Sequence, residues 1–132
     1  MHPCNFRRAV ETGDLNRIMD QFADNAVLNS PITFQPFEGK TAIRQLLAII
    51  IEVFQEFHYT DELEGADGTK ALIFVAKVRN RAAQGIDLLR FNEAARIVDL
   101  TVMVRPRSAM EALLAEVAPR LAAAQQAASA SG

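Results

Sequence analysis

Helical spacing of apolar residues marks three stretches in the first half of the chain. Apolar side chains recur every three or four positions over residues 3–12 and 14–22, and Gly13 separates the two stretches. Asp14 is suited to cap the second helix, because its carboxylate accepts backbone N–H groups left free at a helix start. A third stretch begins at Lys40 and is apolar on almost every side, with Ile43, Leu46, Leu47, Ile50, Val53 and Phe54. Such a helix needs cover on most of its surface, so we expect it to lie across a sheet.

The second half of the chain alternates apolar and polar residues in the manner of antiparallel strands. A short strand over residues 26–29 is followed by residues 33–39, which form a loop or a broken edge strand because they contain proline and glycine. Four longer strands are predicted over residues 57–63, 71–79, 84–91 and 96–105. Pro106 ends the last strand, and Ser108 begins a final helix through an S-x-x-E capping box.

This order of elements predicts a single α+β domain, with helices first, then an antiparallel meander and a closing helix. A length of 132 residues suits one hydrophobic core. We place the domain at residues 1–121. Residues 122–132 are rich in Ala, Gln and Ser, and we expect them to form a disordered tail.

Composition and charge narrow the classes of function. The formal net charge is −2 with both signs spread along the chain, so the sequence lacks the clustered Lys and Arg that nucleic-acid binding requires. One cysteine, Cys4, allows no internal disulfide, and two histidines without metal-ligand spacing argue against a metal site. The longest apolar run, residues 46–51, is too short to cross a membrane. We therefore expect a cytoplasmic protein with no cofactor and with no nucleic-acid or membrane partner.

The last two predicted strands present the main candidate for chemistry. If they pair through a turn at residues 92–95, one face carries Gly85, Asp87, Leu89 and Phe91 beside Val98, Leu100, Val102 and Val104. Asp87 is then the only polar side chain on an apolar face, where the pKa of a carboxyl group rises because ionisation is costly. Such a group serves as a hydrogen-bond donor or as a general acid or base near neutral pH. The alternatives are that Asp87 pairs with an arginine, or that the register is shifted by one and Asp87 faces solvent.

A second polar contact is expected from Tyr59, which shares its strand face with Phe57 and can direct its hydroxyl group into the interior. His58 points to the other side of that strand, so we expect it to be exposed. With Asp87 as the catalytic group, the residues expected to contact a small apolar ligand are Tyr59, Leu89, Leu100, Val102 and Val104.

The opposite face of the same strand pair is half apolar. It carries Ile86, Leu88 and Arg90 beside Ile97, Asp99, Thr101, Met103 and Arg105. A sheet face open to water is normally polar, so we expect this one to be covered. A homodimer that packs sheet against sheet provides one cover. The chain's own C-terminal helix is the alternative.

Four sequence segments, in this order, carry a resemblance to a known family. A helix pair ending in G-D-L is followed by FADNAVLNSP, by FEGKTAIRQLL and by the strand pair IDLLRFNEAARIVDLTVMV. This arrangement resembles the nuclear transport factor 2-like superfamily, which includes the ketosteroid isomerases, the SnoaL-like polyketide cyclases and the limonene epoxide hydrolases. The resemblance covers residues 3–118. It implies a cone-like (cystatin-like) roll, in which a curved antiparallel sheet wraps around the N-terminal helices, with a ligand pocket in its mouth and frequent sheet-to-sheet dimers.

The resemblance transfers only one functional residue of the ketosteroid isomerases. Their oxyanion-hole aspartate corresponds to Asp87, a role that illustrates how an apolar site keeps a carboxyl group neutral as a donor. Ser30 stands where their general base is expected, and Phe6 and Leu47 stand where they have tyrosines. A hydroxyl group cannot replace a carboxylate base for abstracting a proton beside a carbonyl, so steroid isomerisation by that route is not expected.

The other two comparisons differ in how well they fit. The epoxide hydrolases use an Asp-Arg-Asp relay, but Gly85 stands where the arginine would be. Asp99 is expected on the opposite strand face from Asp87 and therefore outside the pocket. A SnoaL-like cyclase needs a pocket acid for proton transfer, which Asp87 supplies. The sequence therefore predicts a SnoaL-like protein with an apolar pocket that binds a small hydrophobic molecule, acting as a cofactor-free isomerase or cyclase through Asp87. The alternative is a non-catalytic ligand-binding or dimerisation module.

Overall fold

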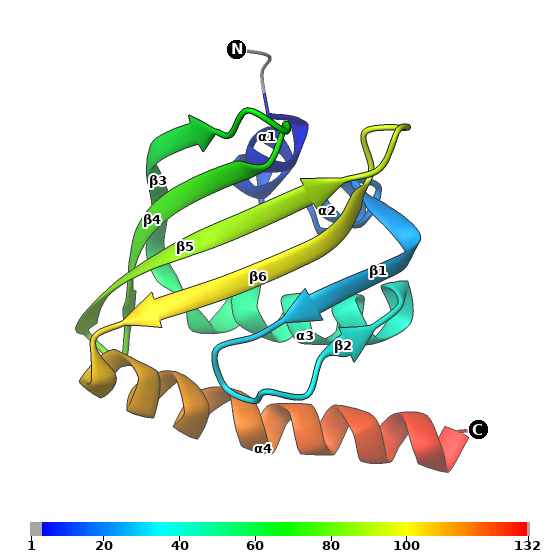
Figure 1. Cartoon of the computed structure of the whole chain (residues 1–132). Coiled ribbons are helices and arrows are strands. Elements are labelled where there is room, and N and C mark those ends of the chain that lie inside the picture. Colours follow the sequence, from blue (N-terminus) through cyan, green and yellow to red (C-terminus); the bar gives the residue numbers. More distant parts are fainter. Residues whose placement is uncertain (1–3, 132) are drawn as a thin grey trace.

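A six-stranded curved sheet and the helices on one side of it make up the fold (Figure 1). The computed structural model describes residues 4–131. The helices are α1 (Asn5–Thr12), α2 (Leu15–Met19), α3 (Lys40–Val53) and α4 (Arg107–Ser131). The strands are β1 (Phe22–Asn29), β2 (Phe37–Glu38), β3 (Gln55–Glu64), β4 (Lys70–Val78), β5 (Arg81–Phe91) and β6 (Ile97–Arg105). This is the α+β roll that the sequence predicts.

The sheet has the strand order β2-β1-β6-β5-β4-β3. Strands β3 to β6 form an antiparallel meander, as predicted, and β1 joins β6 in parallel. β1 begins at Phe22, a residue that helical spacing assigns to the second helix. The backbone N–H of Ile97 donates to the carbonyl of Gln21 at 2.8 Å, and Phe22 pairs with Ile97. Pairing with β6 therefore ends α2 early, at Met19.

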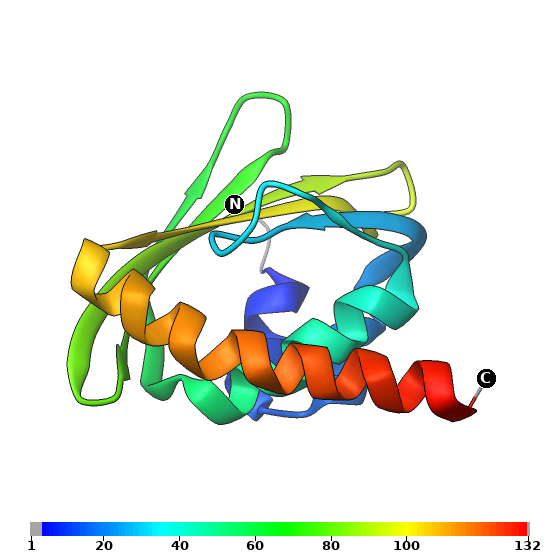
Figure 2. The ribbon, with the colours of Figure 1, turned by 90° about the horizontal axis from the view of Figure 1, so that it is seen from below.

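All four helices of the described chain lie on the same side of the sheet (Figure 2). α3 corresponds to the predicted helix that is apolar on almost every side. It buries Ile43, Leu46, Ile49 and Val53. α4 packs along α3 and against β4, β5 and β6 through buried Ala109, Ala112, Leu113 and Val117. The alternative in which the C-terminal helix covers the outer sheet face is therefore wrong. Within residues 4–131 no helix covers that face.

The C-terminal helix is longer than the sequence predicts. Residues 122–131 continue α4, where their composition indicates a disordered tail (Figure 1). Ala and Gln are strong helix formers, and here they extend a helix already anchored by packing. Arg120 adds ion pairs with Glu116 at 3.3 Å and with Glu52 of α3 at 4.0 Å. The helix also continues through Pro119.

Of the register shifts in the sheet, the one between β5 and β6 and the one after Tyr59 in β3 change which side chains near the site face inward. Between β5 and β6 the register shifts after the Arg90–Asp99 pair, so that Phe91 pairs with Ile97 and not with Val98. Ile97 is therefore fully buried, whereas alternation places it on the outer face. In β3 the register shifts at Thr60. A bulge inserts one residue into one strand and reverses the facing of the residues beyond it.

Candidate functional site

A cavity of about 290 Å³ lies between the inner face of the sheet and the helices. Its wall is almost entirely apolar, with contributions from α1, α3, α4 and the inner strands, including Phe6, Ile50, Leu113, Phe74, Val102 and Val104. The segment after β1 closes one side with Ser30, Pro31 and Ile32. This volume is near the lower end of the range for small-molecule pockets.

Asp87 and Tyr59 form a hydrogen-bonded pair in this apolar wall. The Tyr59 hydroxyl group donates to Oδ2 of Asp87 at 2.7 Å. Both residues line the cavity, and each is 7% exposed. The predicted register is confirmed here, since Asp87 pairs with Val102 of β6 and faces inward. The alternatives of an arginine partner or a solvent-facing Asp87 are wrong.

The ring of Tyr59 is held by its aromatic neighbours. Phe57 meets it edge-on at a centroid distance of 5.1 Å, and Phe74 does so at 6.4 Å. Phe74 in turn lies over Gly85, where an added Cβ atom would stand 2.2 Å from its ring. Gly85 is therefore required for packing, and the structure leaves no room for the arginine of an epoxide-hydrolase relay at this position.

Burial sets the protonation of the pair. Removal from water raises the pKa of Asp87 to about 7, and the hydrogen bond from Tyr59 opposes part of this rise. Burial also raises the pKa of Tyr59, and the neighbouring Asp87 carboxylate raises it further, so the phenol stays protonated as a donor. Near neutral pH both forms of Asp87 are therefore populated.

One oxygen of Asp87 remains available to a ligand. The bond from Tyr59 engages Oδ2, and within residues 4–131 the oxygen Oδ1 accepts no hydrogen bond. No fully buried side-chain polar atom among these residues lacks a partner, so Oδ1 is reachable from the cavity. Asp87 can thus donate a proton from Oδ1 or accept one there, while Tyr59 fixes the other oxygen.

Four of the five residues expected to contact a ligand line the cavity: Tyr59, Leu100, Val102 and Val104. Leu89 does not. It lies two residues beyond Asp87 on the same strand face, pairs with Leu100, and is fully buried in the core. His58 is exposed as predicted, and its Nδ1 lies 3.3 Å from the Glu56 carbonyl oxygen.

The positions compared with the ketosteroid isomerases meet at this cavity. Phe6, Ser30 and Leu47 all line it, although none carries an ionisable group. The Ser30 hydroxyl oxygen accepts the backbone N–H of Ile32 at 3.3 Å, which shapes the segment after β1. Asp99 lies on the outer face, where Asn29 donates to it at 3.4 Å, so it takes no part in the cavity.

Two further contacts of Tyr59 and its neighbours could not be predicted from alternation alone. Arg7 of α1 stacks over the ring of Tyr59, with its Cζ atom 5.7 Å from the centroid. The same guanidinium pairs with Glu62, which the bulge at Thr60 turns inward.

No group of His, Cys, Asp and Glu suited to hold a metal ion occurs among residues 4–131. No helix in that range is long and apolar enough to span a membrane.

Solved structures that are similar to most of the chain share this fold. A protein described as a steroid delta-isomerase from Pseudomonas aeruginosa is 34% identical, with 92% of this chain and 94% of that chain covered and a TM-score of 0.82. An uncharacterised protein with a cystatin-like fold from Silicibacter pomeroyi is 29% identical, with 91% and 86% covered and a TM-score of 0.84. The epoxide hydrolase/cyclase-like enzyme SalBIII is 18% identical, with 79% and 87% covered and a TM-score of 0.66, and it shows the fold alone.

A protein-family model matches the larger part of the chain. The model described as a SnoaL-like domain matches residues 5–100, a range that runs from α1 to the middle of β6. That range includes both Tyr59 and Asp87. The chain therefore belongs to the SnoaL-like domain family, within the nuclear transport factor 2-like superfamily.

Proposed function

We propose that this protein binds a small, mostly apolar molecule in the cavity and that Asp87 transfers a proton on it, in an isomerase or cyclase reaction. The observation that carries the proposal is the buried Tyr59–Asp87 pair in a mostly apolar wall, which Glu11, Ser30 and His58 also line. Isolated carboxyl groups with a raised pKa in a cleft are frequent acid or base catalysts. The ligand therefore needs one polar atom, such as a carbonyl oxygen, within reach of Oδ1.

The proposed step needs no co-reactant. In its ionised form Asp87 takes a proton from a carbon beside the ligand's carbonyl group, which leaves an enolate. Return of that proton from Asp87 to a different carbon of the same molecule gives an isomer. If the enolate carbon first attacks a second carbonyl carbon, a ring closes and the proton goes to the new alkoxide oxygen. In both reactions Tyr59 keeps Oδ2 fixed, so the reacting oxygen is Oδ1.

Similarity to the steroid delta-isomerase supports an isomerase, since that protein is 34% identical over nearly the whole chain. Three residues at the cavity differ from the ketosteroid isomerase pattern. Ser30 offers a hydroxyl group where that pattern has a carboxylate base, and Phe6 and Leu47 offer no hydroxyl group to an oxyanion. We therefore assign the proton transfer to Asp87, whose Oδ1 remains open to the cavity.

The alternative function is binding without catalysis. The same three positions favour it, because efficient proton transfer normally uses an acid and a base together. In that case Asp87 and Tyr59 only recognise the polar atom of the ligand. Turnover separates the two functions, since a binding protein leaves every bound carbonyl compound unchanged.

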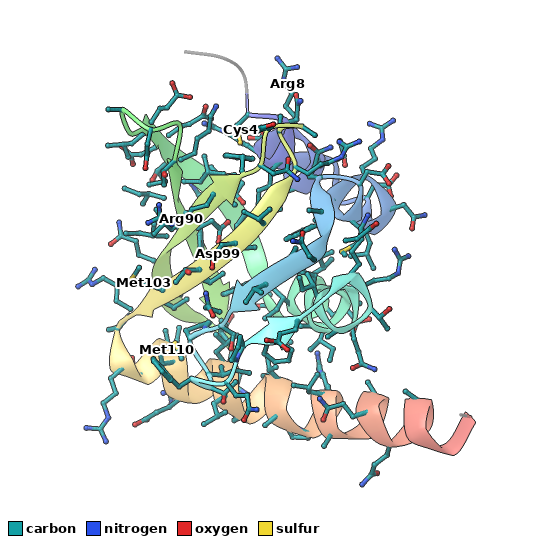
Figure 3. All side chains as sticks on the ribbon, turned by 45° about the vertical axis from the view of Figure 1, so that its right-hand side comes forward. Cys4, Arg8, Arg90, Asp99, Met103 and Met110 are labelled. Carbon is teal, nitrogen blue, oxygen red and sulfur yellow. The ribbon has the colours of Figure 1, made fainter. Side chains whose placement is uncertain are left out.

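The uncovered outer face of the sheet supports a homodimer. Ile73, Val75, Ile86 and Leu88 are only partly buried there, and Met103 is half exposed. Figure 3 shows Met103 on this face with Arg90 and Asp99. A second copy would cover these apolar side chains and could match charges of opposite sign across the interface.

We expect the protein to act in the cytoplasm.

Substitution of Asp87 by Asn tests the proposal. Thermal shift and chemical turnover are measured with three probes: 1-acetonaphthone, cyclohexenone and a steroid enone. The matched control is Asp99→Asn, the same change on the outer face of the same strand pair. We expect the parent and the control to be stabilised by at least one probe and Asp87→Asn to lose that stabilisation and any turnover. Equal stabilisation of Asp87→Asn and the parent by every probe that binds contradicts the proposal.

A further inference from the structure

We propose that Arg7 is a positioning residue for this site: its guanidinium holds the Tyr59 ring in place and strengthens the hydrogen bond from Tyr59 to Asp87. This inference rests on the proposed function of Asp87. It adds a residue on α1 that has no contact with the ligand cavity and acts through Tyr59.

The guanidinium of Arg7 is fixed from two directions. Nε lies 3.3 Å from Glu11 on the same helix, and Nη1 lies 3.2 Å from Glu62 on β3. The Cζ atom stands 5.7 Å from the centroid of the Tyr59 ring, within the distance at which a cation is attracted to an aromatic face. Two carboxylates therefore hold the cation over the ring that donates to Asp87.

The backbone of β3 is shaped to provide Glu62. The register between β3 and β4 shifts at Thr60, so that Glu62 pairs with the buried Leu72 and faces inward. Without this bulge, alternation from Tyr59 would bury Asp61 and Leu63. Instead Leu63 is 53% exposed, while the side chain of Glu62 is only 14% exposed.

Burying a carboxylate while exposing a leucine opposes the hydrophobic effect, so the bulge needs another reason. Glu62 pairs with Arg7 and also with Lys70, whose Nζ lies 3.7 Å away. Bulges occur preferentially beside active sites, where they redirect a side chain. Because Glu62 faces inward, it holds Arg7 against Tyr59. The need to hold Arg7 in this position accounts for the bulge at Thr60.

A cation over the phenol ring affects Asp87 in a defined direction. Positive charge beside Tyr59 makes its hydroxyl group a stronger donor and favours the ionised form of the carboxylate that accepts from it. Cys4, the N-cap residue of α1, and Glu11 of α1 both disfavour additional negative charge on Tyr59, and Lys70 of β4 faces the same region through its ion pair with Glu62. Loss of Arg7 removes the positive charge and leaves Glu62 with less compensation. Both effects favour the protonated form of Asp87.

The test compares Arg7→Met with Arg8→Met. Both variants remove one positive charge from α1, but Arg8 is exposed on the outside of the helix (Figure 3). The pKa of Asp87 is measured in the ligand-free protein by carboxyl-carbon NMR titration, with Asp87→Asn to assign the signal. We expect Arg7→Met to raise this pKa by about half a unit or more, because a nearby positive charge that favours the ionised form is lost, and Arg8→Met to leave it unchanged. Arg7→Lys should restore part of the shift.

An unchanged Asp87 pKa in folded Arg7→Met overturns the inference, as does an equal shift in Arg8→Met. If Arg7→Met does not fold, Arg7→Gln replaces it, because a glutamine amide can still donate to Glu62 while the charge is removed. The same rise is then expected, and its absence overturns the inference. Failure of the proposed function gives a different result, because probe binding would then survive in Asp87→Asn whatever Arg7 does to the pKa.

Discussion

The hydroxyl group of Tyr59 on β3 reaches across β4 to the carboxylate of Asp87 on β5, at 2.7 Å. These strands are not neighbours in the sheet, since β4 lies between them. The contact forms because Phe74 of β4 lies over Gly85, and the Tyr59 ring packs edge-on against Phe74. A glycine beside the acid thus allows the aromatic side chains that bring the phenol to it.

Removal of the Tyr59 hydroxyl group should raise the pKa of Asp87 above its value of about 7. In Tyr59→Phe the carboxylate loses the hydrogen bond that favours its ionised form, while burial still disfavours ionisation. A hydrogen bond to a charged group contributes about 1.5–3 kcal/mol, so we expect a rise of about one unit or more. Carboxyl-carbon NMR measures it. A pKa that stays the same or falls would mean that the bond does not stabilise the carboxylate.

The raised pKa of Asp87 should make stability depend on pH in a particular direction. The folded state holds the Asp87 proton up to pH about 7, whereas the unfolded chain releases it near its ordinary value of 3.8. Between these values the folded state binds more protons, so the contribution of Asp87 to stability falls as pH rises and levels off above pH 7.

Urea denaturation of the parent and Asp87→Asn at pH 4.5, 6 and 7.5 isolates this contribution. The difference in unfolding free energy, parent minus variant, should decrease with pH by up to about 1.4 kcal/mol per unit. A difference that increases with pH would indicate that the folded protein prefers ionised Asp87.

Gly85→Ala should destabilise the protein strongly. Its Cβ atom would lie 2.2 Å from the Phe74 ring and 2.6 Å from the backbone carbonyl oxygen of Met103, which cannot move without disturbing β6. Overpacking a core typically costs about 1–3 kcal/mol, and we expect at least the upper end of that range. Gly65→Ala is the control, because its Cβ atom meets nothing nearer than Asp67 Oδ1 at 3.2 Å in an exposed turn. Comparable thermal stability of the two variants contradicts this packing.

An arginine on the outer face should prevent dimer formation. Leu88 lies near the centre of that face on β5, so Leu88→Arg places an unpaired charge in the proposed interface. Sedimentation equilibrium should show a dimer for the parent and a monomer for the variant. Glu93→Arg, in the exposed turn between β5 and β6, should remain a dimer. A parent that is monomeric at every concentration, or a dimeric Leu88→Arg, excludes this interface.

Strict alternation of inward-facing and outward-facing side chains correctly predicts the part of the site that lies between β-bulges. From Gly85 to Arg90 no irregularity interrupts β5, so parity alone places Asp87 inward and opposite Val102. Beyond the bulges the same reasoning gives Ile97 and Leu63 the wrong face, because an inserted residue leaves no signature in the hydrophobic pattern. The role of Glu62 is hidden for that reason.

Other differences arise where tertiary contacts override local preference. Phe22 fits a helical spacing but pairs with Ile97, and backbone hydrogen bonds to a strand remote in sequence are not visible locally. Leu89 lies on the expected face yet is sealed in the core, because parity gives the side of a sheet and not the extent of a cavity. Residues 122–131 are helical although they have no large apolar side chains, since α4 is already anchored upstream.

The pKa of Asp87 in the ligand-free protein tests the central claim most directly. Carboxyl-carbon NMR titration, with Asp87→Asn to assign the resonance, should give a value of about 7, the behaviour of a buried carboxyl group that holds one hydrogen bond from Tyr59. A value at or below the ordinary 3.8 would show a solvated or ion-paired carboxylate, and it would contradict proton transfer by Asp87 in an apolar cavity.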